Sequence, residues 1–499
     1  MAMSELLLEP DLSWVRPAHV GLFVVFSFSI YLAVSLVQRS HPAKLDLPIF
    51  EVQNEVVKTI EEAHKKYPDS PFVLSLVGME MVILPRSSID LIKSLPETHV
   101  SIKKHHHDVF LGEYTYMGTK TEEFDAAMRH DLTRNTPTVL ASFNAEIQHA
   151  IDENVGSCRN WTPLKPRAAM CRVASLMSGR AFVGVPLSHD EEWVEATVNY
   201  TGNVTQAWLH LRTLNRFVQP FVAPFLPQVK ALMRMREMTS RKMAPLLEEI
   251  ARGDDKGETS DTAGGDMIRW FQGRYDTKAS ARELARDQLL ATFASIYNLS
   301  NALTYLMFDL ASYPECIEPL RRELDEVLGD QETIDKDHLQ RLKKLDSFVR
   351  ESQRHSPPSL ANMPRVVTHP DGLRLPTGQY LPQGTRIMVR AHTLNMDPEL
   401  YPDPTRFDAF RFSRLREAPG SEFKYQHVTT GTDNINFGHG VWACPGRFFA
   451  SSQMKVVMAH ILRNYDIKLP EGQPRPKQQH YGLAILPDAT AEVVLKSRV

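Results

Sequence analysis

Residues 437–447 read FGHGVWACPGR, and this run places one cysteine, Cys444, in a short loop of small residues. An apolar segment with helical spacing follows at once, so the positive end of its dipole favours a thiolate. Gly440 and Gly446 allow a tight turn whose amide N–H groups point at the sulfur, and Phe437 can cover it. Because an axial haem ligand needs these features, we expect the Cys444 thiolate to bind haem iron and to favour O–O cleavage.

The spacing Phe-x-x-Gly-x-x-x-Cys-x-Gly closely resembles the haem-binding loop of the cytochrome P-450 monooxygenases. Four residue types recur at fixed offsets, here as Phe437, Gly440, Cys444 and Gly446. The resemblance implies a mainly α fold with small β-sheets, the cytochrome P-450 fold, which holds haem b through a cysteine thiolate. A buried structural cysteine is the alternative, since a cysteine outside a disulfide often behaves as a small hydrophobe.

A second motif lies about ninety residues upstream. Glu351 and Arg354 end a strongly helical run, and an offset of three puts both on one helix face. Alone, this is a common surface ion pair. It resembles the family's Glu-x-x-Arg pair, which locks to a later arginine, and Arg411 in the run FDAFRF is the expected third member. The resemblance implies a buried triad that orders the core below the cysteine loop.

Haem propionates need cationic or N–H donors. In this family one donor usually stands two residues before the cysteine as arginine or histidine, but here that residue is Trp442, whose indole N–H carries no charge. Arg365, in the run MPRV, matches another propionate-binding position. Arg129, in the run RHDLT, resembles the early helix that covers the haem, and a solvated helix arginine is the alternative.

The predicted oxygen-activating helix departs from the family pattern. Residues 289–300 read LLATFASIYNLS, where the family usually has Ala/Gly-Gly-x-acid-Thr-Thr. Aligned on Ala294, the glycine becomes Ser295, the acid becomes Tyr297 and the threonine becomes Asn298. An asparagine amide can hold a water but is a poor proton source, so Ser295, Tyr297 and Ser300 are candidate partners in a relay. A locally bonded buried asparagine, a poorly coupled enzyme, and desaturation or rearrangement in place of oxygen insertion are the alternatives.

The N-terminal segment is different in character. Residues 18–37 are mostly apolar, and about twenty such residues span a bilayer core. Basic residues follow this segment while acidic ones precede it, which places the bulk of the protein in the cytosol. A cleaved signal peptide is the alternative, but no Ala-x-Ala site follows the apolar run. We predict a lumenal N-terminus (1–17), a single-pass anchor in the endoplasmic reticulum membrane (18–37), a proline-containing hinge (38–49) and a cytosolic haem-thiolate domain (50–499).

The composition of the chain limits the classes of partner that it is expected to bind. The formal net charge of −3 gives no indication of nucleic-acid binding, and four scattered cysteines give no disulfide framework. No flavin or dinucleotide motif is present, so the resemblance implies that electrons come from NADPH through a separate NADPH–cytochrome P-450 reductase. Lys424, Arg447 and Lys455 are candidate docking residues for that reductase, with ordinary solvated charges as the alternative.

The substrate is expected to be lipophilic. Phe217, Phe221 and Phe225 lie in a proline-broken segment that, in this family, roofs the pocket and dips into the membrane; core packing is the alternative. Apolar pocket walls are expected from residues 293–297, 360–363 and 483–486. The whole pattern is most similar to membrane-bound fungal enzymes of secondary metabolism, for which a terpenoid or meroterpenoid is the leading substrate, oxidised with O2. A haem-binding sensor or isomerase that does not activate oxygen is the second hypothesis.

The coarse pattern predicts a helix over residues 50–65, short strands over 71–85 and strands between 365 and 389. A polar loop is expected over 253–265, and the rest up to about residue 313 is predicted to be mostly helical. His105–His107 are predicted to lie in a loop over the distal pocket. Three adjacent histidines converge poorly on one ion, so a metal site there is not favoured.

Overall fold

A computed structural model describes residues 45–53, 55–76, 79–118, 121–252, 264–275 and 279–498, together with Phe28. The chain divides into a unit of residues 1–47 and a unit from Pro48 to Val499, and the second unit is described below. The predicted anchor over 18–37, apart from Phe28, and most of the predicted polar loop lie outside the described residues. Within the described part, no helix has the length and apolar character needed to cross a membrane.

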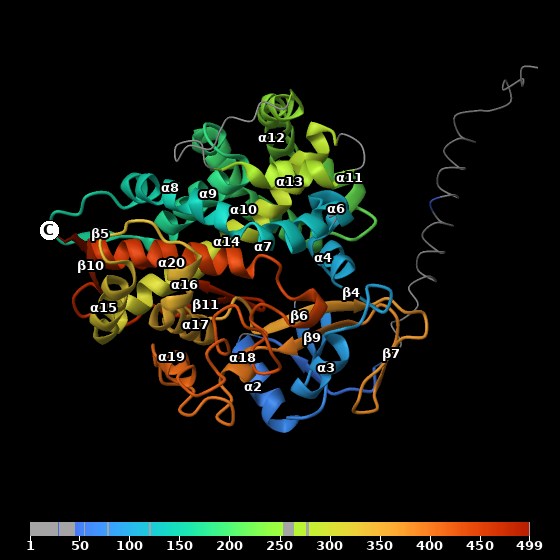
Figure 1. The fold of residues 1–499 in the computed structure, drawn as a ribbon. Helices are drawn as coiled ribbons and strands as arrows, with labels where there is room; N and C mark the ends of the chain where they lie inside the picture. The colour runs from blue at the N-terminus through green and yellow to red at the C-terminus, as the bar shows by residue number, and fades with distance from the viewer. Residues whose placement is uncertain are drawn as a thin grey trace, which may run out of the picture. The chain divides into compact units, whose positions relative to one another are not determined.

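Helices dominate the second unit (Figure 1). The α-helices are α2 (Val56–Lys66), α3 (Ile89–Ile92), α4 (Ile102–Phe110), α5 (Gly112–Thr115), α6 (Glu122–Ala126), α7 (Leu132–Arg134), α8 (Thr136–Asn154), α9 (Pro166–Val183), α10 (Glu191–Thr213), α11 (Gln219–Val222), α12 (Pro227–Arg252), α13 (Asp266–Arg274), α14 (Ala281–Ser312), α15 (Ile317–Leu328), α16 (Lys336–Arg341), α17 (Lys343–His355), α18 (His392–Asn395), α19 (Arg411–Leu415) and α20 (Arg447–Asn464). Short helical turns include η2 (Ala127–Asp131), η4 (Ala223–Phe225) and η6 (Gly440–Trp442).

The strands form small sheets, as the sequence predicts. Among the described residues, the largest sheet has the order β1 (Ile49–Glu51), β2 (Phe72–Leu76), β3 (Met79–Leu84), β9 (Arg386–Arg390), β6 (Ala361–Val367) and β4 (Val100–Ser101). The smaller sheets pair β10 (Tyr465–Lys468), β13 (Val493–Ser497) and β5 (Thr162–Leu164), then β11 (Gln478–Tyr481) with β12 (Ala484–Pro487), and β7 (Leu373–Arg374) with β8 (Tyr380–Leu381).

The long helix α14 forms the centre of the helical layer. It starts with a capping box, in which the Ser280 hydroxyl and the Glu283 carboxylate each accept from the other's backbone N–H. Most of its length is buried because α9, α10 and α12 pack around it, and α17 and α20 pack against it as well. Figure 1 shows α14 and α20 near the middle, with α8, α9, α10 and α12 on one side and the β6–β9 sheet on the other. Helices α14 and α20 therefore lie where the helical layer meets the β6–β9 sheet.

Two local predictions are wrong. Residues 50–65 are not one helix, because Phe50 lies on β1, where it pairs with Leu74 of β2, and α2 starts only at Val56. His105–His107 lie in α4 and not in a loop, since the Ser101 hydroxyl caps this helix by accepting from the Lys104 N–H at 2.9 Å. Successive helical residues point in different directions, so the three imidazoles do not converge on one point.

Candidate haem-thiolate site

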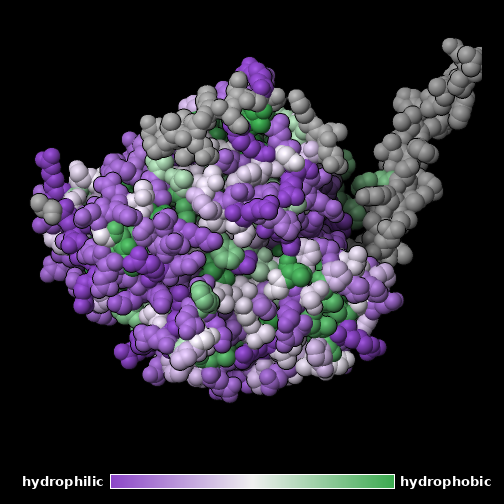
Figure 2. Space-filling view, in the orientation of Figure 1, coloured by the Kyte–Doolittle hydropathy of each residue, from purple (hydrophilic) through white to green (hydrophobic). Residues whose placement is uncertain are grey.

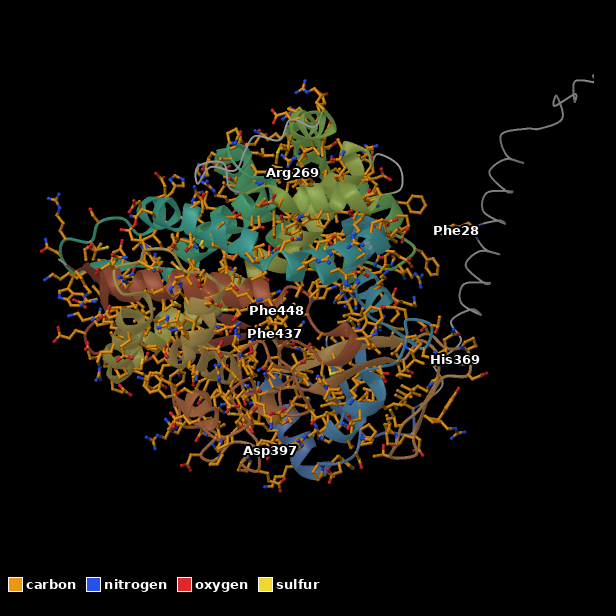
Figure 3. The ribbon with its side chains drawn as sticks, in the orientation of Figure 1. Phe28, Arg269, His369, Asp397, Phe437 and Phe448 are labelled. Carbon is orange, nitrogen blue, oxygen red and sulfur yellow. The ribbon has the colours of Figure 1, made fainter. Side chains whose placement is uncertain are left out.

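The cysteine loop is closed by backbone hydrogen bonds. The Cys444 N–H donates to the Phe437 carbonyl at 2.7 Å, and the Val441 N–H donates to the Lys93 carbonyl at 3.0 Å. Gly440 has a φ of +76°, and a Cβ there would lie 2.2 Å from the Lys93 oxygen, so only glycine fits. Figure 3 labels Phe437 and Phe448 close to each other, and Phe448 lies in the first turn of α20. The loop is thus fixed by contacts that do not involve the sulfur.

Positive groups surround the cysteine. Helix α20 begins at Arg447, three residues after Cys444, so the N–H groups of its first turn lie next to the loop. The Arg447 side chain donates through Nη1 to the Cys444 carbonyl at 2.9 Å. Burial lowers the pKa of Arg447, and the charge of Cys444 opposes that shift. Since none of the four cysteines, all in the described part, forms a disulfide, Cys444 is available as a half-buried thiolate.

Two arginines converge beside the loop without a carboxylate partner in the described part of the chain. Arg365 of β6 is 1% exposed, and its Nε has no hydrogen-bond partner there. Burial lowers its pKa to about 10; Glu97 opposes the shift and the charge of Arg129 adds to it. Arg129 of η2 donates through Nη1 to the Val441 carbonyl at 2.5 Å. A buried cation with an unfilled donor is suited to an anionic ligand.

Trp442 acts differently from the expectation. Its indole N–H donates to the Leu95 carbonyl at 3.0 Å, so this donor is already used and does not serve a propionate. The ring instead supports Arg129, whose guanidinium carbon lies 4.5 Å from the ring centroid. Trp442 therefore positions a cation where the family usually supplies one directly from this residue.

The three residues of the expected triad are in contact. Arg354 donates twice to the Glu351 carboxylate, through Nε at 2.8 Å and Nη2 at 2.7 Å, and Arg411 reaches it through Nε at 3.3 Å. Burial opposes ionisation of Glu351, but the hydrogen bonds from Arg354 and His355 outweigh it and lower the pKa to about 2. Arg354 and Arg411 also bind carbonyls between residues 395 and 406, so the triad fixes the chain leading to the cysteine loop.

Lys455 is not a surface residue, which corrects its assignment as a docking residue. It lies in α20, is 7% exposed, and its Nζ contacts the buried Asp346 carboxylate at 2.5 Å. Arg416 pairs with the same carboxylate at 3.2 Å. Burial raises the pKa of Asp346, but the Lys455 and Arg416 cations outweigh that effect and hold the pKa below its usual range. Of the other candidates, Lys424 is exposed and Arg447 is half-buried.

The side chains of the predicted relay residues of α14 are not hydrogen-bonded to one another in the described part, and the Ser300 hydroxyl donates to the Tyr297 backbone carbonyl at 2.9 Å. Asn298 is exposed, and its Nδ2 donates one turn back to the carbonyl of Ala294, which is also exposed. The Ser295 hydroxyl donates to the Thr292 carbonyl at 3.4 Å. Tyr297 lies against α9, where the Arg167 guanidinium carbon is 5.1 Å from its ring centroid. The exposed face of α14 is therefore formed by Ala294 and Asn298, while Tyr297 packs toward another helix.

A group of aromatic and cationic residues was missed by sequence reasoning. Phe110 of α4 contacts Phe293 of α14 and Trp208 of α10, with ring centroids 5.5 and 6.4 Å apart. Arg212, one turn after Trp208, has its guanidinium carbon 5.4 Å from the Trp208 ring centroid. No sequence signal joins these residues, because they come from three separate segments that only the fold brings together. Only Phe293 falls within a predicted pocket wall.

One further cluster has the composition of a metal site. Glu146 and His149 of α8 and His189 place ligand atoms close together. The buried Glu146 carboxylate is already satisfied by the Arg180 guanidinium at 3.2 Å and by His189 Nε2 at 2.8 Å. A cation would have to compete with that arginine, so the cluster is a buried, paired carboxylate.

The comparisons with known proteins agree with this geometry. The family model described as Cytochrome P-450 matches residues 38–493. The cytochrome P-450 monooxygenase ataF of Aspergillus terreus is 63% identical over 496 residues, covering 99% of this chain and 100% of the relative. The cytochrome P-450 monooxygenase gliF of Aspergillus fumigatus is 54% identical, covering 97% and 99%. The retinoic acid-bound cyanobacterial CYP120A1 has the same fold, with a TM-score of 0.66 at 17% identity over 91% of this chain and 99% of that one.

The residues described above fit the haem that this family binds through a cysteine thiolate. Cys444 supplies the sulfur ligand at the start of α20. The unfilled Nε of Arg365 and the neighbouring Arg129 supply the positive charge that the two propionates need. Figure 2 shows a mostly hydrophilic surface on which apolar groups gather near the centre, where Figure 1 places the start of α20. Haem, an apolar ring system with two acidic side chains, matches this combination.

Proposed function

Because the chain belongs to the cytochrome P-450 family and is a haem-thiolate monooxygenase, we propose that it oxidises a small lipophilic intermediate of fungal secondary metabolism. O2 is the oxidant, and electrons come from NADPH through a membrane-bound reductase. The arrangement of Cys444 between a closed loop and the N-terminus of α20 carries this proposal. Haem bound there activates dioxygen, while the protein positions the substrate and supplies protons.

On the distal side, Asn298 takes the place of the usual threonine. Its amide presents a donor and an acceptor on the exposed face of α14, next to Ala294, and can hold a water there. An amide does not release a proton as a hydroxyl does, so the proton comes from that water and Asn298 orients it. Ser295 and Tyr297 take no direct part, since their hydroxyl and ring have other neighbours.

The substrate we propose is apolar over most of its surface. The rings of Phe110, Trp208 and Phe293 form an aromatic wall beside the exposed face of α14. A terpenoid or meroterpenoid skeleton is our proposal, by analogy with fungal enzymes of this kind.

We place the enzyme at the endoplasmic reticulum membrane, anchored by residues 18–37 with its catalytic domain in the cytosol. Support comes from the proline-broken segment, where Phe221 and Phe225 of α11 and η4 are each 73% exposed and Val218 is 43% exposed. Such a patch favours an interfacial contact over core packing. Lys424, which is exposed on the side of the cysteine loop, is the remaining candidate contact for the reductase.

The test is expression with a fungal reductase in microsomes. A carbon monoxide difference spectrum should show the thiolate-type band, and NADPH and O2 should be consumed in a substrate-dependent manner. Extracts of a host producing apolar secondary metabolites, with terpenoids and other classes as separate panels, are then searched by mass spectrometry for products heavier by one oxygen. An isomerase, favoured only by the changes at Asn298 and Tyr297, would convert its substrate without NADPH or O2.

A further inference from the structure

Two hydrogen-bond donors on the distal side, Trp208 Nε1 of α10 and Arg386 Nε of β9, are buried and have no partner within the described residues. His105 Nδ1 of α4, a ring nitrogen of a neutral imidazole, is also buried and unpartnered there. Buried polar atoms are nearly always satisfied in folded proteins, because an unpaired donor keeps its full desolvation cost. A group of such atoms in one region therefore indicates a ligand that supplies the acceptors.

The charged side chains described in this region are cations. Arg212 of α10 donates through Nη1 to the Met79 sulfur, a weak acceptor, and forms no ion pair with a described carboxylate. Burial lowers the pKa of Arg212, and the nearby Arg386 lowers it further. Burial also lowers the pKa of His105 to about 4, with the charge of Arg386 acting in the same direction. Two arginines thus share a partly buried region, and neither forms an ion pair with a carboxylate of the described residues.

The donors lie along the substrate side of the haem site. The α4 helix packs on β6 and on α10, which brings His105, Arg386 and Trp208 to one region. Trp208 contacts Phe110, and Phe110 contacts Phe293, the residue directly before the exposed Ala294 of α14. Arg365 and Arg129, next to the cysteine loop, suffice for the two propionates, so Arg212 and Arg386 are left for another ligand.

We propose that Trp208, Arg212 and Arg386 form an oxygen-acceptor site, which selects substrates carrying a carboxylate or a polarised carbonyl on an otherwise apolar, aromatic-sized skeleton. This inference rests on the proposed function, since it names the polar end of the same lipophilic substrate. The aromatic wall holds the skeleton near α14, and the two guanidinium groups and the indole N–H hold the oxygens. The arginines suit a carboxylate, while the uncharged indole donor suits a carbonyl.

The experiment uses the full-length holoenzyme in nanodiscs and three matched probes: 2-naphthylacetate, its primary amide and 2-ethylnaphthalene. Dissociation constants are measured from the Soret shift and, independently of spin state, by equilibrium dialysis. Hydrogen bonds to charged groups predict that the acid or the amide binds about ten- to a hundredfold more tightly than the hydrocarbon. If 2-ethylnaphthalene binds as tightly as both polar probes, the proposal is wrong.

Variants separate the two acceptor types. Arg212→Gln and Arg386→Gln should remove the preference for the acid, and Trp208→Phe should reduce the preference for the amide, with 2-ethylnaphthalene affinity nearly unchanged. Arg374→Gln and Trp161→Phe are matched controls, because each also belongs to a cation–aromatic pair but lies on the exposed surface. If all three site variants keep the wild-type preference, the oxygens are bound elsewhere and the inference fails.

The experiment distinguishes failure of the oxygen-acceptor site from failure of the proposed monooxygenase function. A carbon monoxide band of normal height in each variant shows that the haem site is intact, and a missing band in the wild type would instead overturn the monooxygenase proposal. Should a variant lose haem, the wild-type ranking of the three probes still decides the question. Arg386→Lys, which keeps the charge but loses the planar fork, should retain part of the acid preference.

Discussion

The two sides of the haem site are built in opposite ways. On the cysteine side, the Cys444 backbone N–H, the Trp442 indole N–H and the Glu351 carboxylate find partners within the chain, while the Nε of Arg365 beside the loop is left for a haem propionate. On the substrate side, Trp208 Nε1 and Arg386 Nε have no partner among the described residues. A saturated network fixes one geometry, while an unsaturated one accepts a ligand. The hydrogen bonds of the cysteine loop and the triad therefore form a scaffold, while the unpaired donors on the substrate side form a recognition surface.

The largest effect on the cysteine side is expected when the Cys444 sulfur is removed. Cys444→Ala should abolish the thiolate-type carbon monoxide band and all monooxygenase turnover, because no other group offers a ligand at the start of α20. Cys171→Ala, at a buried cysteine of α9, is the control and should keep the band. Retention of the band in Cys444→Ala would mean that the ligand has been assigned to the wrong residue.

The next largest effect should come from the triad. Glu351→Gln leaves Arg354 and Arg411 buried without their counter-charge, which should cost about 3–5 kcal/mol in the free energy of unfolding. Denaturant unfolding followed by circular dichroism measures this loss. Glu318→Gln, in an exposed pair with Arg322 at 3.9 Å, should change stability by less than about 0.5 kcal/mol. Equal losses in both variants would refute a special role for the buried carboxylate.

The Glu351 carboxylate should also make the free energy of unfolding fall as the solution becomes acidic. The pKa of Glu351 is about 2 in the folded protein and lies near its ordinary value of 4.5 in the unfolded chain. Its ionised form therefore stabilises the fold fully above pH 4.5, and this contribution is lost as the pH falls from 4.5 toward 2. The free energy of unfolding of Glu351→Gln, measured across this window, should lack that part of the decline.

A smaller effect tests the distal side. Asn298→Leu removes the amide that orients a water on α14, so the product formed per NADPH consumed should fall about ten- to a hundredfold, while substrate affinity changes little. Asn298→Thr, which restores the hydroxyl usual in the family, should couple at least as well as the wild type. Ser295→Ala is the control and should be near neutral, since that hydroxyl bonds its own helix. Normal coupling in Asn298→Leu would exclude Asn298 from proton delivery.

The smallest effect should appear at the exposed patch. Replacing Phe221 and Phe225 by serine removes apolar side chains that are 73% exposed and should leave the carbon monoxide band unchanged. If these rings enter the membrane, the apparent KM for a membrane-partitioned substrate should rise a few-fold in microsomes and stay constant in detergent, since each ring contributes about 1.5–3 kcal/mol when buried. Trp161→Ser, at a side chain that is 43% exposed and lies outside both this patch and the haem site, is the control and should leave KM unchanged. An unchanged KM in microsomes would argue for an exposed patch without membrane contact.

Much of the cysteine side could be predicted from the sequence, and little of the substrate side. The cysteine loop and the Glu351–Arg354 spacing are local patterns, and the small sheets follow from alternation and turn residues. The predicted helix over 50–65 was wrong at its start, because a short apolar run containing Phe50 fits a strand equally well. Pairing with β2 makes this run a strand in the folded chain. The burial of Lys455 was missed because a lysine in an amphipathic run looks solvated until its partner, Asp346, is placed by another helix.

The grouping of Trp208, Arg212 and Arg386 could not be predicted for a similar reason. These residues lie up to about 180 positions apart in the sequence, and only the packing of α4 between α10 and β6 makes them neighbours. Unpaired donors also leave no pattern in a sequence, because whether a donor is satisfied depends on the whole tertiary environment.

Arg354 and Arg411 close on the Glu351 carboxylate using only groups of the polypeptide itself. The segment that leads to the cysteine loop therefore takes its shape before any porphyrin arrives. We therefore expect chains made without haem to keep the receptor preformed and to take up the group when it is supplied. Feeding a porphyrin precursor during growth should raise the coloured fraction of the purified protein while the total amount of chain stays the same.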